Sequence, residues 1–366
     1  KAWQDKYNPQ ISLPINLYGD ERPNSQGIDL TDVDLVTQMK SNVDQWFADN
    51  QLTKDQVPQG SDPVTNPANH NEIIGYITHV NEQEMSNIVA NGATAFEQWS
   101  KTDVSVRANV LNKTADLLEA HRDEFIALCI KEAGKVPVDG VSEVREAVDF
   151  LRYYAVRAQE LMKDQRLASR GVVLCISPWN FPLAIFLGQV SAAIVTGNTV
   201  VAKPAEQTSL IALRAIELLI EAGLPEHVVQ PVIARGSKVG QVIVPDHRIA
   251  AVMFTGSTET GTRIAQDLAA RGGDPVPLIA ETGGQNCMIV DSTALPEQVV
   301  DDVIASGFQS AGQRCSALRV LFLQEEIADK VITMIKGAMK ELHVGDPQFF
   351  SSDIGPVIDN KAFTAL

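Results

Sequence analysis

The most constraining feature of this sequence is a regular alternation of short apolar segments and helical segments between Gly171 and Ala270. Strands are predicted at residues 172–176, 199–202, 228–233 and 250–254, and helices at residues 183–195, 210–221, 237–244 and 259–270. Strands that are apolar throughout and separated by helices are typical of a parallel sheet covered on both faces. The sequence therefore predicts an α/β fold built on such a sheet.

The segments on either side of this region divide the chain into three parts. Residues 1–58 predict an extended arm rich in Pro, Asn and Gly, then a helix that ends near Asp49. Residues 59–282 predict the sheet domain, preceded by a polar stretch at 59–71, a strand at 73–80 and a layer of four helices that ends with the longest, at 142–162. Residues 283–366 predict the start of a second α/β domain, with strands at 287–290 and 319–323 and helices at 296–310 and 325–342.

Charge and composition exclude several classes of function. The formal net charge of −16 argues against binding nucleic acid or an anionic membrane through bulk electrostatics, and no apolar run reaches membrane-spanning length. The four cysteines lack CxxC spacing and the six histidines lack ligand spacing, so neither a metal site nor a disulfide framework is indicated. No signal peptide precedes the first residue, and we expect a cytoplasmic protein. Because the chain begins at Lys1 and stops just inside a predicted helix, we expect it to be part of a longer polypeptide.

Ligands of open parallel sheets bind beyond the carboxyl ends of the strands, which selects four junctions of this chain. At one junction Thr255, Gly256 and Ser257 follow a strand and open a helix, where backbone N–H groups can hold a phosphate or Ser257 can simply cap the helix. At another, Lys203 and Glu206 can hydrogen-bond ribose hydroxyls or form a solvated ion pair. The residues alone leave both alternatives open at each junction.

The other two junctions carry side chains suited to catalysis. Asn180 lies on a turn between two prolines, where its amide can donate a hydrogen bond to an oxyanion or hold the turn. Glu281 ends an apolar strand and precedes two glycines. A desolvated carboxylate at this position would have a raised pKa and could act as a base, unless it is a fully hydrogen-bonded structural residue.

Cys315 is the candidate nucleophile of the chain. It follows Gly312 and Arg314 in a predicted loop, where a thiol can be exposed and its thiolate favoured by positive charge. The alternative is a small buried apolar residue, as free cysteines usually are. Arg314 could raise the thiolate fraction or serve as a structural cation.

Five short motifs occur in a fixed order at residues 178–182 (PWNFP), 203–206 (KPAE), 254–257 (FTGS), 281–284 (ETGG) and 312–315 (GQRC). In this order and spacing they resemble the aldehyde dehydrogenase superfamily, and the resemblance runs from about Asn71 to Leu366. Residues 14–27, 176–189, 203–208, 279–286 and 312–321 are also similar to the L-glutamate γ-semialdehyde (pyrroline-5-carboxylate) dehydrogenase domains of the proline utilization A group of bifunctional flavoenzymes.

This resemblance implies a role for each motif. Cys315 would attack the aldehyde carbon, the Asn180 amide and the Cys315 N–H would hold the oxyanion, and Glu281 would activate water to release the acid. The resemblance further implies NAD as the cofactor, bound by Ser177, Pro178, Trp179, Lys203, Glu206, Thr255, Gly256, Ser257 and Gly283. Ser316 would contact the substrate α-carboxylate, and Phe186 is a second expected substrate contact.

The resemblance also implies an architecture and partners. It predicts a Rossmann-like NAD-binding domain and a truncated catalytic domain, a homo-oligomer, and a flavin-dependent (FAD) proline dehydrogenase domain upstream of Lys1. The expected function is the NAD-dependent oxidation of L-glutamate γ-semialdehyde to L-glutamate, the second step of proline catabolism.

Two departures from the family pattern leave other functions open. Only residues 163–170 separate the long helix from the next strand, so the family's oligomerisation hairpin is missing from this sequence. The later segments that clamp the nicotinamide ribose and the substrate carboxylate are also missing, and we expect residues 1–366 by themselves to be inactive as a dehydrogenase. Alternatives are the oxidation of another semialdehyde, such as succinic semialdehyde, and a non-catalytic module used for oligomerisation.

Overall fold

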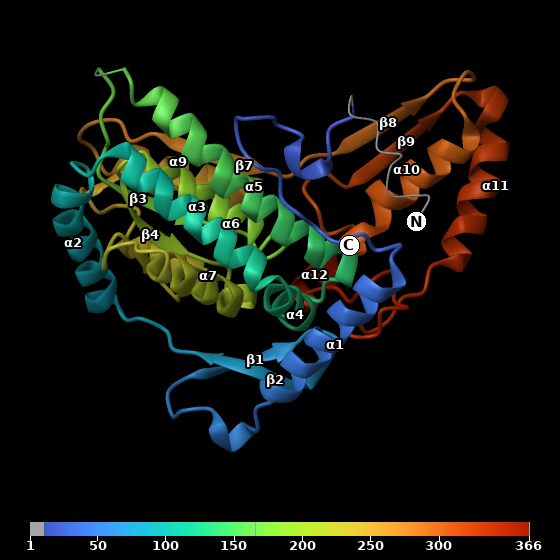
Figure 1. The fold of residues 1–366 in the computed structure, drawn as a ribbon, viewed down its shortest axis with the longest axis horizontal. Coiled ribbons are helices and arrows are strands. Elements are labelled where there is room, and N and C mark those ends of the chain that lie inside the picture. The colour runs from blue at the N-terminus through green and yellow to red at the C-terminus, as the bar shows by residue number, and fades with distance from the viewer. Residues whose placement is uncertain (1–10, 165, 366) are drawn as a thin grey trace, which may run out of the picture.

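The centre of the molecule is a five-stranded parallel sheet, shown in Figure 1. In this computed structural model, which describes residues 11–164 and 166–365, the strands lie in the order β5-β4-β3-β6-β7. They comprise β3 (Val172–Ile176), β4 (Thr199–Lys203), β5 (Val229–Pro231), β6 (Ile249–Gly256) and β7 (Leu278–Thr282). The connecting helices are α6 (Ala184–Val195), α7 (Ser209–Glu221), α8 (Gly236–Val242) and α9 (Thr258–Ala270). The predicted α/β fold is therefore confirmed.

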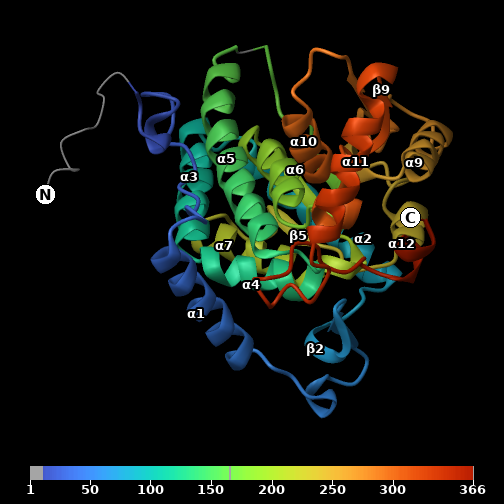
Figure 2. The same ribbon diagram turned by 90° about the vertical axis from the view of Figure 1, so that its right-hand side faces the viewer.

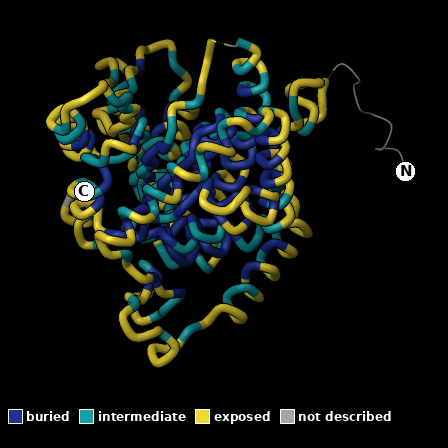
Figure 3. Tube along the Cα trace, turned by 90° about the vertical axis from the view of Figure 1, so that its left-hand side faces the viewer, coloured by how far each residue is buried: buried dark blue, intermediate teal, exposed yellow. Residues whose placement is uncertain are grey.

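Side chains on the two faces of the sheet belong to two separate cores. On β3, Val173 and Cys175 pack with α6 and α7, whereas Val172 and Leu174 pack with α2 (Glu82–Trp99), α8 and α9. Successive side chains of a strand point to opposite faces, so a strand covered on both sides must be apolar at every position. Figure 3 shows the buried residues concentrated in this layered centre.

A second helical layer covers α6 and α7, as Figure 2 shows. It consists of α3 (Val104–Ala120), α4 (Arg122–Ala133) and α5 (Pro137–Leu161). The helix predicted at 142–162 begins five residues earlier, because Pro137 occupies the first turn of α5, where its missing N–H costs nothing. None of the helices in the described part of the chain combines the length and the apolar content that a membrane span requires.

Before these layers the chain forms a helix and an antiparallel hairpin. The short 3₁₀ turns η1 (Pro14–Asn16) and η2 (Lys54–Gln56) flank α1 (Val33–Asp49). Strands β1 (Asp62–Asn66) and β2 (Asn69–Ile77) pair antiparallel. The polar stretch at 59–71, for which no strand was predicted, contains β1. This strand is polar and half exposed, so it carries no apolar pattern that could reveal it.

The last part of the chain forms a smaller α/β unit. Strands β8 (Asn286–Val290) and β9 (Leu318–Leu323) pair in parallel, and α10 (Pro296–Phe308) and α11 (Glu325–Glu341) cover one face of the pair through Val299, Val303 and Val331. The 3₁₀ turn η4 (Gln309–Gly312) follows α10, and α12 (Asn360–Ala365) is the last element. The predicted boundary after residue 282 falls between β7 and β8, which belong to different sheets.

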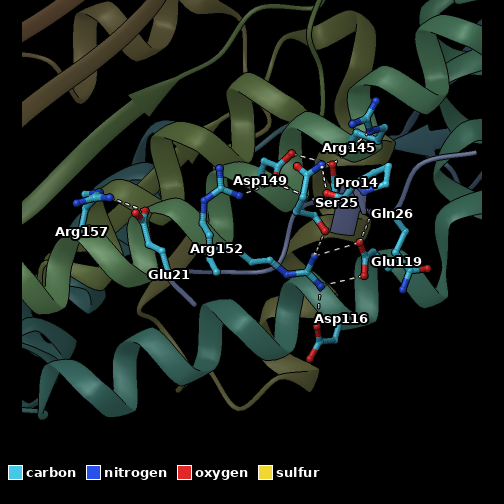
Figure 4. A network of polar contacts seen from close by, with 12 residues as sticks. Pro14, Glu21, Ser25, Gln26, Asp116, Glu119, Arg145, Asp149, Arg152 and Arg157 are labelled. Atoms are coloured by element: carbon cyan, nitrogen blue, oxygen red, sulfur yellow. Dashed lines mark hydrogen bonds and ion pairs between the residues drawn. The ribbon is translucent and has the colours of Figure 1, made fainter. Parts of the chain in front are cut away.

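The N-terminal arm is tied to the helical layer by charged side chains, shown in Figure 4. Asp149 on α5 accepts hydrogen bonds from the Arg22 guanidinium at 2.6 Å and from the Ser25 hydroxyl at 2.7 Å. Arg152, one turn further along α5, forms an ion pair with Glu119 on α3 at 2.9 Å. Glu119 also accepts a hydrogen bond from the backbone N–H of Gln26 at 2.9 Å. Charged hydrogen bonds therefore hold the predicted arm in a fixed course over α3 and α5.

Two buried glutamates join the helical layer to the helices beneath it. Glu132 on α4 accepts hydrogen bonds from the N–H groups of Leu210 (2.7 Å) and Ile211 (2.9 Å) in the first turn of α7. Glu143 on α5 accepts from the N–H group of Ala184 at 2.9 Å, at the start of α6. The first N–H groups of a helix have no partner within the helix, and they favour a negative charge. These carboxylates supply the missing acceptors inside the protein.

We predict that Glu132→Gln changes how thermal stability depends on pH. Burial raises the pKa of Glu132 to about 8, although the N–H groups of α7 oppose this rise. The folded protein therefore binds a proton that the unfolded chain releases above its ordinary pKa of 4.5, and the wild type loses stability as the pH rises through that window. Glutamine does not titrate, so the melting temperature of the variant should improve relative to wild type between pH 5 and pH 8.

Calorimetry at three pH values in this window tests the prediction. The matched control is Glu226→Gln, which makes the same substitution at an exposed glutamate. The prediction is contradicted if the difference in melting temperature between Glu132→Gln and wild type stays constant from pH 5 to pH 8.

Candidate active site

A cavity of about 400 Å³ lies beyond the carboxyl ends of β3, β6 and β7. The chain after β3 crosses to β4 and β5 on one side, whereas β6 pairs on the other side of β3, so the sheet order reverses at this position. Such a reversal is where open α/β sheets bind their ligands. The lining residues are Pro178, Trp179, Asn180, Ile185, Thr255, Gly256, Ser257, Thr258, Glu281, Thr282, Gly283, Gln313, Arg314, Cys315 and Ala362. The three predicted catalytic residues, Asn180, Glu281 and Cys315, thus meet in one cavity.

Asn180 connects the turn after β3 to the loop that carries the cysteine. Its side-chain nitrogen donates a hydrogen bond to the backbone carbonyl oxygen of Gln313 at 2.9 Å, two residues before Cys315. The Gln313 side chain in turn accepts a hydrogen bond from the N–H of Ile358 at 3.0 Å. An amide nitrogen carries two hydrogens, so Asn180 can hold the loop with one N–H and still offer the other to an oxyanion.

Cys315 is exposed on a loop whose backbone is fixed from several sides. Its carbonyl oxygen accepts a hydrogen bond from the Asn286 side chain at 2.7 Å, and the carbonyl oxygen of Gly312 accepts one from Arg319 at 2.7 Å. Gly312 has a φ of 68°, and Ser310 and Ala311 before it also have positive φ. The loop therefore holds an accessible thiol in a conformation that its own backbone disfavours.

The other three cysteines differ from Cys315 in position and environment. Cys129 and Cys175 are buried, and burial raises the pKa of both thiols, which disfavours the reactive thiolate. Cys287 lies on β8 and is exposed. Of the two exposed thiols, Cys315 is the one that lines the cavity.

Glu281 lies on β7, paired with Thr255 of β6, and faces the same cavity. The sequence predicted a desolvated carboxylate, but Glu281 is exposed. The reason is that β7 is the edge strand of the sheet, and its last four residues are open to solvent. An exposed carboxylate beside an exposed thiol can still activate water that enters the cavity.

The predicted cofactor residues divide between this cavity and a second one of about 710 Å³. Pro178, Trp179, Thr255, Gly256, Ser257 and Gly283 line the first. Lys203 lines the second, together with residues of α8 and α9. Glu259 and Thr260 line the second cavity, and the adjacent Thr258 lines the first, so the two cavities meet at the first turn of α9.

Lys203 lines the second cavity, and Glu206 lies beside Lys203 without lining that cavity. Lys203 is buried, which lowers the pKa of its ammonium group against the opposing effect of Glu206. The two charged groups are 3.8 Å apart, and Glu206 accepts a hydrogen bond from the backbone N–H of Gly236 at 3.0 Å. The predicted solvated ion pair is therefore half buried, with its lysine turned toward a cavity.

The turn at 255–257 serves the fold and leaves room for a ligand. Ser257 caps α9 by accepting a hydrogen bond from the N–H of Thr260 at 3.2 Å, which confirms the N-cap interpretation. A Cβ atom on Gly256 would come within 2.6 Å of the Phe254 ring, so only glycine fits. Thr255, Gly256 and Ser257 all line the smaller cavity.

Four predicted site residues lie outside the lining of both cavities: Ser177, Phe186, Glu206 and Ser316. Phe186 is 1% exposed and belongs to the core beneath α5, so the prediction of a substrate contact was wrong, and its neighbour Ile185 lines the cavity instead. Because α6 is apolar along most of its length, its sequence does not indicate which side chain faces the cavity. Ser177 is buried, and its hydroxyl has no hydrogen-bond partner within the described residues. Ser316 is exposed beside Cys315, and its role remains a prediction.

Arg314 is a structural cation in this arrangement. Its guanidinium forms an ion pair with the buried Asp139 at 2.7 Å. The cysteine loop is also held by the bond from Ile358 to Gln313 and by the bond from Asn286 to the Cys315 carbonyl oxygen. None of these contacts, including the one with Asp139, was predicted from the sequence. Gln313 could have been suspected from its motif, whereas nothing in the sequence near Asp139 indicates a partner 175 positions away. Within residues 11–164 and 166–365 no group of acidic, histidine and cysteine side chains could hold a metal ion.

Comparison with known proteins agrees with this geometry. The sequence profile of the aldehyde dehydrogenase family matches residues 55–366. The chain belongs to the aldehyde dehydrogenase family. It is 46% identical to the bifunctional protein PutA of Escherichia coli (strain K12), over 97% of this chain and 28% of that protein. It is 36% identical to 1-pyrroline-5-carboxylate dehydrogenase of Anoxybacillus flavithermus, over 82% of this chain and 61% of that enzyme.

A solved family structure shares the fold. The crystal structure of 1-pyrroline-5-carboxylate dehydrogenase from Thermus with bound NAD has a TM-score of 0.85 and 27% identity, over 92% of this chain and 70% of that chain. The aldehyde dehydrogenase fold expected from the motifs is therefore confirmed. The chain spans about 28% of the length of the PutA relative and 61% of the dehydrogenase relative.

Proposed function

We propose that the protein containing this chain oxidises L-glutamate γ-semialdehyde to L-glutamate with NAD⁺. The observation that carries the proposal is the convergence of Cys315, Asn180 and Glu281 on one cavity at the reversal of the sheet order. The names of the PutA and 1-pyrroline-5-carboxylate dehydrogenase relatives support the choice of substrate. The direct test is NADH formation with the semialdehyde and with succinic semialdehyde, with L-glutamate identified as the product of the first.

The residues present fit the dinucleotide. The buried Lys203 and the neighbouring Glu206 suit a ribose in the larger cavity, and the glycine turn with the first N–H groups of α9 suits a pyrophosphate between the two cavities. Bound NAD⁺ supplies the hydride acceptor for the oxidation. Pro178, Trp179, Thr255 and Gly283 line the smaller cavity and would surround the reacting end of the cofactor.

The chain's own residues perform the covalent steps. The Cys315 thiolate attacks the aldehyde carbon, a carbon–sulfur bond forms, and the carbonyl electron pair moves to oxygen. The Asn180 amide and the Cys315 backbone N–H hold that oxyanion. Loss of hydride leaves a thioester, and Glu281 takes a proton from the water that attacks it, releasing the acid and the thiol. We assign Ser316 to the substrate carboxylate on the basis of its exposed position beside Cys315.

The setting of the enzyme is also part of the proposal. The bifunctional relatives and their greater length support a linked proline dehydrogenase domain that carries FAD. The exposed apolar side chains of β8 and β9 agree with a larger assembly, and we propose a homo-oligomer in the cytoplasm. Size measurement in solution and fractionation of cells test these two points.

We predict that Cys315→Ala abolishes aldehyde oxidation in the full natural chain. Without the nucleophile no thioester forms, and kcat should fall by about 10³-fold or more. The control is Cys287→Ala, which removes the other exposed thiol outside the cavity and should leave turnover within about twofold. Turnover that survives in Cys315→Ala would exclude the mechanism.

We predict that Glu281→Gln separates the two halves of the reaction. A base that acts only on water should leave the first hydride transfer intact and slow thioester hydrolysis, so a rapid burst of NADH should precede slow turnover. Stopped-flow absorbance measures both phases. If the burst is lost as well, Glu281 acts earlier, on the Cys315 thiol.

We predict a preference for NAD⁺ over NADP⁺ of at least about tenfold in kcat/KM. Glu206 stands 3.8 Å from Lys203 at the larger cavity, and its carboxylate would repel a 2′-phosphate. Glu206→Gln should lower the ratio of kcat/KM with NAD⁺ to kcat/KM with NADP⁺. Glu259→Gln is the matched variant, since Glu259 lines the same cavity from α9. An equal response to both changes would mean that the repulsion does not come specifically from Glu206.

A further inference from the structure

The loop that carries Cys315 rests on a buried carboxylate from a distant part of the chain. Asp139 lies in the first turn of α5, and its side chain is 0% exposed. One of its oxygens accepts hydrogen bonds from the side chains of Gln309 and Arg314, both at 2.7 Å. The other accepts from the Ser310 hydroxyl at 2.8 Å. Every side-chain hydrogen bond recorded for Asp139 therefore goes to the segment just before the nucleophile.

That segment needs support from outside itself. Ser310 and Ala311 have φ values of 53° and 55°, in the left-handed region that costs a residue with a side chain about 1 kcal/mol or more. Within the turn, the Ser310 hydroxyl also accepts from Arg314 at 3.2 Å, and the Ser310 carbonyl oxygen accepts from the N–H of Gln313 at 3.0 Å. Asp139 connects the two ends of the turn, because it accepts hydrogen bonds from both Gln309 and Arg314.

The arrangement differs from an ordinary stabilising ion pair on the same helix. Asp149 lies ten positions further along α5 and pairs with Arg22 and Ser25 of the N-terminal arm. Neither of these partners belongs to the cysteine loop. Burying a charged pair contributes little net stability, but removing one partner leaves the other as an unpaired buried charge, which is strongly destabilising. Loss of the Asp149 charge would therefore affect Arg22 in the N-terminal arm, whereas loss of the Asp139 charge would affect Arg314, the residue before Cys315.

We propose that Asp139 is a positioning residue for the reaction. It holds the turn from Gln309 to Arg314 so that Cys315 points into the cavity toward Asn180 and Glu281. The Asn180 bond to Gln313 holds the same loop from the opposite side, so the thiol is located by contacts from the turn after β3 and from α5 together. The kinetic part of this inference rests on the proposed function, and the structural part does not.

The experiment compares Asp139→Asn with Asp149→Asn in the full natural chain. Asparagine keeps the size of Asp139 but removes its charge and one acceptor oxygen. We expect kcat/KM for the semialdehyde to fall at least about tenfold while the Kd for NAD⁺ stays within about twofold. In hydrogen exchange, backbone amides of residues 308–316 should exchange at least about tenfold faster, with the rest of the chain unchanged. Asp149→Asn should show neither effect.

Two further variants keep the test decisive. Arg314→Gln combined with Asp139→Asn should lose no more activity than the larger single loss, because the two residues act as one unit, and losses that multiply would overturn the proposal. If Asp139→Asn fails to fold, Ser310→Ala removes one of the three hydrogen bonds to Asp139, together with the bond from Arg314 to the Ser310 hydroxyl. Unchanged exchange at 308–316 together with unchanged kcat/KM in that variant would also overturn it.

The exchange measurement separates this inference from the proposed function. If the wild-type enzyme does not oxidise the semialdehyde, the proposed function fails, and faster exchange at 308–316 in Asp139→Asn still supports the role of Asp139. If the wild type is active and Asp139→Asn matches it in exchange and turnover, the positioning role is wrong and the function stands.

Discussion

Carboxylates buried against groups with positive charge or partial positive charge hold this structure together between its layers. From α4 to α5 the chain contributes Glu132, Asp139 and Glu143, and each accepts hydrogen bonds from a different element: α7, the cysteine loop and α6. Burying three carboxylates in an apolar environment would be costly without these donors. The requirement that each be satisfied fixes the helical layer relative to the sheet and the loop relative to both. Removal of one element would leave a buried carboxyl group without its hydrogen-bond partners.

The site depends on this arrangement because none of its side chains is positioned by its own segment alone. Asn180 is on the turn after β3, Glu281 on the edge strand β7, and Cys315 on a loop of the smaller unit. The hydrogen bond from Asn180 to Gln313 joins the first of these to the third. Between the two cavities, residues of the first turn of α9 line both: Thr258 lines one, and Glu259 and Thr260 line the other. Cofactor and substrate would therefore share one rigid support.

The sequence predicted the sheet, its helices and the three catalytic side chains, because each depends on local information. Apolar strands such as β3 are recognisable without knowledge of their neighbours, and motif residues such as Cys315 are recognisable by spacing. The missed features depend on tertiary contacts. The polar strand β1 exists only through pairing with β2, the exposure of Glu281 follows from its place on the edge strand, and Phe186 is buried because of what packs on α6. Asp139 finds its partner Arg314 175 positions away in the chain.

The order of strands in the sheet has a consequence for how the protein folds. β3, β4 and β5 follow one another in the chain and pair as neighbours, so they can assemble with α6 and α7 as a compact unit. The pairing of β3 with β6 closes a much longer loop of chain, which has a larger entropic cost and makes that step slower. The cavity lies at this long-range pairing. A folding intermediate in which only β3, β4 and β5 were paired would lack the candidate catalytic site, and its uncovered β3 edge would be a site where another chain could pair and aggregate.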